Sequence, residues 1–143
     1  MPSKTTMKRA RRDKAQGKSA STQAGEFVRE EMHHIREGKH GARSTKQAIA
    51  IGLSKARRSG VKLAPGGSKA TRRKARRDLS HGKRRPSRSR SRGAMRALRR
   101  MPHKAASRRS LSRQAHTAAM RRSASSRSAS ARKAARTRKS HGR

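Results

Sequence analysis

Large apolar side chains are concentrated between residues 27 and 63, where they recur at helical spacing. A first helix is predicted to begin at Ser21 or Thr22 and to end at Gly38, because glycine commonly terminates helices. Its apolar residues share one face, which Glu31 interrupts. These apolar residues are Phe27, Val28, Met32 and Ile35.

A second helix is predicted after a short link, and its limits are marked more clearly. Ser44 and Gln47 have the spacing of a capping box, and Gly60 followed by an apolar residue is typical of a Schellman stop. Small residues recur at every fourth position, so a partner helix can approach this face closely. They are Ala48, Gly52 and Ala56, beside Ile49 and Leu53. The link contains two glycines and favours an antiparallel helical hairpin over residues 21–64.

One basic segment occurs twice, with an offset of 65 positions. The first copy covers residues 6–18 and the second covers residues 71–83, and each has Thr at its start and Gly near its end. A shorter echo at residues 55–58 ends the second predicted helix. Each copy can form a helix that is basic on nearly every face. We expect like-charge repulsion to keep it mostly unfolded until phosphate neutralises it.

The remaining sequence has too few apolar residues for a large core. Hydrophobic residues make up 28% of the chain and many are alanine, which is too little to offset the entropy of ordering every residue. We therefore predict a mostly disordered protein with a small all-α element, a helical hairpin flanked by basic, conditionally helical arms. The predicted zones are a basic N-terminal arm (1–20), the hairpin (21–64) and a basic low-complexity tail (65–143). The thin hairpin core favours marginal stability or self-association into a homo-oligomer.

Charge indicates the kind of partner. The chain has 44 Lys and Arg against 6 Asp and Glu, a formal net charge of +38. The abundant cellular polyanions that neutralise such an excess are DNA and RNA. If ~10 contacts form, log K should fall with log salt at a slope of about −9. We expect backbone-phosphate contacts from the two repeat copies and from the end of the second predicted helix. The residues are Arg9, Arg11, Arg12, Lys55, Arg57, Arg58, Arg72, Arg73, Lys74, Arg76 and Arg77.

Several other kinds of partner fit the sequence less well. A membrane surface is not expected, because the chain has no Trp, no Tyr and one Phe, and no apolar run or signal peptide is visible. We therefore expect a soluble, intracellular protein. Phe27 is assigned to the core, which disfavours base stacking on single strands and favours duplex or structured nucleic acid. Only Gln47 is a candidate base reader, so sequence-specific recognition is not expected.

Enzymatic and metal chemistry are also not predicted. Cysteine is absent, and no serine lies in a nucleophile elbow. His33, His34, His40 and the nearby glutamates are candidate metal ligands. Glu30 with His33, and Glu31 with His34, have Glu-x-x-His spacing, but both pairs lie on one predicted helix. We instead expect Glu30 to pair with His34, and His33 with Glu37, on a solvated face. No cofactor is expected.

The hairpin sequence resembles a family of small basic bacterial proteins. The resemblance is carried by residues 21–31 (STQAGEFVREE) and 33–58 (HHIREGKHGARSTKQAIAIGLSKARR), and it covers about residues 1–64. Members of the family are described as being of unknown function, as DNA-binding or as plasmid stabilization proteins. The resemblance implies a bacterial, cytoplasmic, nucleoid-associated role and supplies no catalytic residue.

Together these features predict nucleic-acid binding without sequence specificity, in a chromatin-like or plasmid-stabilisation role. The residues alone do not separate DNA from RNA, and the preference for DNA rests on the resemblance. Two alternatives stay open. One is an RNA- or ribosome-associated basic protein, and the other is a protein-interaction module in which the hairpin docks a partner.

Overall fold

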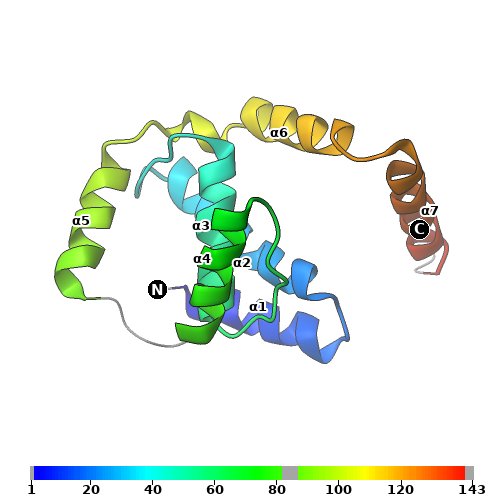
Figure 1. The fold of residues 1–143 in the computed structure, drawn as a ribbon, viewed down its shortest axis with the longest axis horizontal. Coiled ribbons are helices and arrows are strands. Elements are labelled where there is room, and N and C mark those ends of the chain that lie inside the picture. The colour runs from blue at the N-terminus through cyan, green and yellow to red at the C-terminus, as the bar shows by residue number, and fades with distance from the viewer. Residues whose placement is uncertain (1, 82–86, 141–143) are drawn as a thin grey trace. The chain divides into compact units, whose positions relative to one another are not determined.

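The computed structural model describes residues 2–81 and 87–140, and within them the chain is helical (Figure 1). These residues form seven α helices and one short 3-10 helix, and they contain no strand. The helices are α1 (Lys4–Ala15), α2 (Ala20–Arg36), α3 (Thr45–Arg58), α4 (Lys69–His81), α5 (Arg88–Arg99), η1 (His103–Ala106), α6 (Arg108–Met120) and α7 (Ala124–Ser140). Because 76% of the chain is helical, the prediction of a mostly disordered protein is wrong.

Serine caps give a local reason for this helicity. Six of the described helices follow a serine whose Oγ accepts the backbone N–H three residues later, at 3.1 to 3.4 Å. The pairs are Ser3–Thr6, Ser19–Thr22, Ser44–Gln47, Ser68–Thr71, Ser87–Arg90 and Ser123–Ser126. Each such cap stabilises a helix by about 1 kcal/mol. The serines that suggested low complexity therefore mark helix starts, and the alanines between them favour helix.

The helical hairpin is present as α2 and α3, which pack against each other. α2 starts earlier than predicted, because Ser19 rather than Ser21 or Thr22 is its N-cap. The stop of α3 matches the prediction, since Gly60 has φ +92° and the N–H of Val61 donates to the carbonyl of Ala56 at 3.1 Å.

The small-residue face of α3 lies directly against α2. A Cβ added to Gly52 would lie 2.7 Å from Cα of Val28, so the two helices are in backbone contact there. Ala56 and Phe27 are fully buried in the adjoining core. The first helix of the chain completes this core, because Ala10 of α1 joins the same cluster and partly buried Met7 packs against it.

The two repeat copies fold as α1 and α4, which pack on opposite members of the hairpin, α1 on α2 and α4 on α3 (Figure 1). Both copies bury the same two positions. These are Ala10 and Asp13 in the first copy, and Ala75 and Asp78 in the second. The expectation that the copies stay unfolded without phosphate is therefore corrected: the hairpin supplies the contacts that order them. The predicted end of the second copy, at Gly82 and Lys83, lies outside the described residues.

Part of the predicted low-complexity tail closes over the link between α2 and α3. The N–H of Gly41 donates to the carbonyl of Leu98 at 2.9 Å, and Oγ1 of Thr45 donates to the carbonyl of Ala105 at 2.7 Å. A Cβ on Gly41 would lie 1.8 Å from the carbonyl oxygen of Met101, so only glycine fits at this crossing. Residues 98–106 thus belong to the fold of the hairpin and are not a free tail.

The chain divides into two compact units, Met1–Ser107 and Arg108–Arg143. The second unit consists of α6 and α7, which have no buried residues. Among the described residues, none of the helices is long and apolar enough to cross a membrane.

Candidate nucleic-acid interface

The solvent faces of α1 and α4 carry most of the residues predicted to contact phosphate. Because each copy turns its alanine and aspartate inward, the basic positions between and beside them on the helix point outward. The exposed predicted residues are Arg9, Arg11 and Arg12 on α1, and Arg72, Arg73, Lys74, Arg76 and Arg77 on α4. The structure thus presents eight exposed cationic side chains on two helices, and six of them form three pairs at matching positions of the repeat, Arg9 with Lys74, Arg11 with Arg76 and Arg12 with Arg77.

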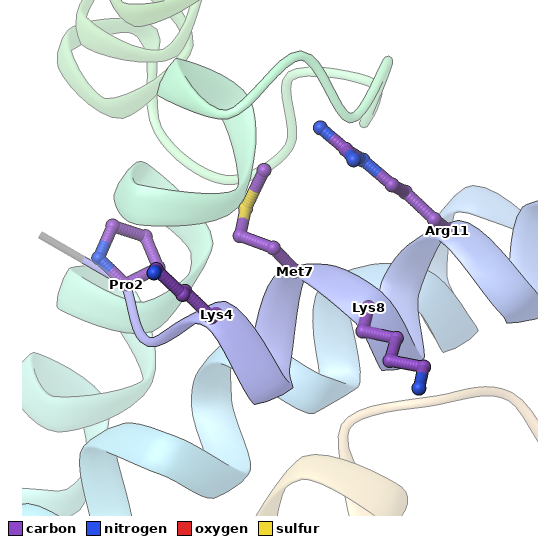
Figure 2. Close-up of a pocket in the computed structure, with 5 residues that line it drawn as sticks. All are labelled: Pro2, Lys4, Met7, Lys8 and Arg11. Atoms are coloured by element: carbon purple, nitrogen blue, oxygen red, sulfur yellow. The ribbon is translucent and has the colours of Figure 1, made fainter.

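The start of α1 adds a pocket whose lining is cationic (Figure 2). Its lining residues are Pro2, Lys4, Met7, Lys8 and Arg11, so three of the five carry positive charge and none is acidic. Figure 2 shows Met7 and Arg11 extending to the same side of α1, while Lys8 extends to the opposite side. Met7 packs against the hydrophobic core and so holds α1 in one orientation. Arg11 lies four residues later and therefore projects on the same side of the helix.

The three predicted residues at the end of α3 have different surroundings. Arg58 is exposed, and its Nε lies 3.6 Å from Oδ1 of Asp78. The Nζ of Lys55 pairs with Oε2 of Glu31, so its charge is already matched. Arg57 is only 8% exposed, and its Nε has no hydrogen-bond partner among the described residues. Of the three, Arg58 is therefore the one that extends the exposed surface.

All six acids of the chain lie in the described residues, and each has a polar or charged neighbour within the protein. In that part of the chain, five Lys or Arg side chains reach a carboxylate. They are Arg9, Lys18, Lys39, Lys55 and Arg58. The acids thus serve to hold the fold. Among the described residues, no carboxylate pairs with an arginine of α4.

A second polar cluster lies where α2 meets the link. The two predicted pairs are present, with His33 Nε2 at 2.9 Å from Glu37 Oε1 and His34 Nε2 at 3.9 Å from Glu30 Oε1. The Glu30 pair is not on a solvated face as expected, because the Glu30 side chain is only 7% exposed. Partial burial, followed by the charge of the Lys55 ammonium, lowers the pKa of His34.

The sequence argument missed the centre of this cluster. Glu31 is 1% exposed, and its Oε1 lies 3.1 Å from Nε2 of His40, a residue of the link. The available signal was the acid in the middle of an apolar face, because a buried carboxylate requires a partner. The identity of that partner depends on how the link folds back, which helical periodicity does not indicate.

Comparison with known proteins finds a similarity to a family and indicates no activity. Residues 14–69 match a family described as "Family of unknown function (DUF6496)". The chain is similar to that family over α2, α3 and the segments that flank them. No curated protein and no solved structure matches the chain. The similarity therefore covers the hairpin, while the exposed basic faces of α1 and α4 lie largely at or beyond its edges.

Proposed function

We propose that this protein binds nucleic acid without sequence specificity, through contacts between Lys or Arg side chains and backbone phosphates, and that DNA is its partner. The observation that carries the proposal is the common register of the two repeat copies. Each copy buries one alanine and one aspartate at matching positions, and each turns its arginines to solvent.

The physical basis is charge that the fold leaves unneutralised. Arginine binds phosphate through charge-assisted hydrogen bonds, which can be bidentate. Holding two such helices on one scaffold costs folding free energy through like-charge repulsion, and a polyanion relieves that repulsion. Because the helices are ordered before binding, the entropy of ordering them is not lost again in the complex.

The lack of exposed Phe, Tyr or Trp side chains supports a duplex partner. Phe27 is the single Phe, Tyr or Trp residue of the chain and is fully buried, so none of these large rings is available to stack on the bases of a single strand. The choice of DNA over RNA still rests on the resemblance to small basic bacterial proteins, which also suggests nucleoid association and a role in plasmid stabilisation. The protein-interaction alternative is less favoured, because α1 covers apolar residues of the hairpin that a partner would otherwise use.

The experiment compares two versions of α4 in the full chain. In the first version, Arg72, Arg73, Arg76 and Arg77 become Gln, and in the second version they become Lys. Affinity for a duplex DNA is measured by fluorescence anisotropy over a series of salt concentrations. Each lost phosphate contact should make the slope of log K against log salt shallower by about 0.9, so the Gln version should lose about 3.6.

The Lys version is the matched control, because it keeps the four charges and removes only the bidentate geometry. Its slope should equal that of the unchanged protein. If the Gln version also keeps the original slope, the exposed face of α4 does not contact phosphate and the proposal fails.

A further inference from the structure

Three side chains with metal-ligating atoms converge where the link folds back on α2. Glu31 and His34 are three residues apart on α2, so they lie on the same face of the helix. His40 comes from the link. One ligand atom from each of the three residues lies within 4.8 Å of those of the other two. The ring centroids of His34 and His40 are 6.1 Å apart and the ring planes meet at 80°, so the two rings lie edge to face and are not stacked on each other.

One of the two carboxylate oxygens of Glu31 has no hydrogen-bond donor among the described residues. The Oε2 atom of Glu31 accepts from Lys55, but the Oε1 atom is buried and has no hydrogen bond among the described residues. Its nearest ring atom is Nε2 of His40 at 3.1 Å, and that contact is an ion pair only when Nε2 carries a proton. Otherwise a nitrogen lone pair faces a carboxylate oxygen, and the two repel each other.

The other nitrogen of His40 indicates which atom is free to bind a cation. Nδ1 of His40 lies 3.1 Å from the carbonyl oxygen of Gly41. In the neutral tautomer that donates from Nδ1 to that carbonyl, Nε2 keeps a lone pair directed at Glu31. Histidines that ligate metals commonly donate their second N–H to a backbone carbonyl in this way.

We propose that Glu31, His34 and His40 bind one Zn²⁺ ion. Two imidazoles and one carboxylate form a three-residue set that suits zinc, with water as the fourth ligand, whereas Mg²⁺ and Ca²⁺ prefer oxygen ligands. Tetrahedral bonds of about 2.1 Å place neighbouring ligand atoms about 3.4 Å apart. The 3.1 Å separation of the Glu31 and His40 atoms is already close to that value.

The ion would join the link to α2, because His40 is the ligand that lies outside the helix. The large positive charge of the chain does not prevent this, since charges more than about 8 Å away are largely screened at physiological salt. Within that distance the buried Oε1 atom of Glu31 faces the ion, while the Lys55 ammonium pairs with Oε2 of the same carboxylate and opposes the ion. The proposal is independent of nucleic-acid binding and stands or fails separately from it.

The test uses the full chain, treated with a chelator and then titrated with Zn²⁺ in a calorimeter. The decisive variant is His34→Ala, because the His34 side chain is 22% exposed and its loss should leave the fold intact. The matched control is His33→Ala, one residue earlier on α2, whose side chain is 68% exposed and pairs with Glu37. Circular dichroism verifies that both variants remain helical.

The unchanged protein and His33→Ala should each bind one Zn²⁺ with equal affinity, and His34→Ala should bind at least about tenfold more weakly. Co²⁺ in place of Zn²⁺ should give the visible absorption of a tetrahedral site, and this absorption should disappear in His34→Ala. Mg²⁺ should not bind. The proposal is overturned if no Zn²⁺ binds, because a proton then fills the position, or if both variants lose affinity equally, because surface histidines then account for the binding.

Discussion

Replacing Gly52 by Ala tests the packing that holds the two basic helices on one scaffold. The added Cβ would lie 2.7 Å from Cα of Val28 and 3.0 Å from its backbone nitrogen. Carbon atoms pack at roughly 3.5 Å or more, so α2 and α3 must separate by about 1 Å at this point. Overpacking of this kind costs about 3 kcal/mol at the upper end, because backbone cannot rotate away. Alanine returns about 1 kcal/mol through helix propensity, which leaves a net loss of about 2 kcal/mol.

The assay is urea denaturation of the full chain, followed by far-ultraviolet circular dichroism. Gly25→Ala is the matched control, because Gly25 lies on α2 and a Cβ there meets nothing within 4 Å. This control should raise the free energy of unfolding by about 1 kcal/mol. The two Gly-to-Ala changes should therefore differ in sign. If Gly52→Ala stabilises the protein as much as Gly25→Ala does, the close approach of α2 and α3 is wrong.

Two further changes test the cap of α3 and the docking of α4. Ser44→Ala removes the Oγ that accepts the N–H of Gln47 at 3.2 Å, so the free energy of unfolding should fall by about 1 kcal/mol in the same urea assay. Ser44→Asp keeps an oxygen acceptor at the N-cap and should retain most of the stability of the unchanged protein. Asp78→Ala removes the acceptor that Ser54 Oγ reaches at 2.7 Å, and hydrogen exchange should show α4 amides opening more easily by about 1 to 2 kcal/mol. Equal loss of protection in α2 and α4 would contradict the second expectation.

The hairpin was predictable because its signals are local. Ser44 at the start of α3 and Gly60 after its end act within one helical turn, and both appear in the structure as the sequence indicates. The same local logic was available for the other helices. Ser3 and Ser68 stand 65 positions apart, three residues before the threonines of the repeat, and cap both copies in the same way. Their meaning was obscured by a composition that resembles disorder.

Long-range contacts could not be predicted in the same way. Ala75 and Asp78 give α4 no recognisable apolar stripe, since one is small and the other is charged. The burial of Asp78 depends on Ser54 and Arg58 of α3, which contact its carboxylate. Likewise, nothing near Ala105 in the sequence indicates that its carbonyl accepts from Thr45, 60 residues away. The fold was underestimated because much of its core is built from alanines and paired charges, with few large apolar side chains.

The same limit applied to the candidate sites. The exposed arginines of α1 and α4 were found from charge and repetition alone, since surface charge needs no partner within the chain. Lys55 and Arg57 belong to the same basic pattern, but their surroundings depend on Glu31 and on burial that the pattern does not encode. Charge composition therefore indicated the chemistry, whereas the structure is needed to separate exposed cations from those that hold the fold.

The most direct test of phosphate binding is the affinity of the full chain for two duplex DNAs of unrelated sequence, measured over a range of salt concentrations beside a structured RNA. With the eight exposed repeat residues engaged, the slope of log K against log salt should be about −7 or steeper. The two DNAs should bind equally well, and neither should bind more weakly than the RNA at equal salt. A shallow slope would contradict the phosphate mechanism, and a clear preference for RNA would contradict the assignment of DNA.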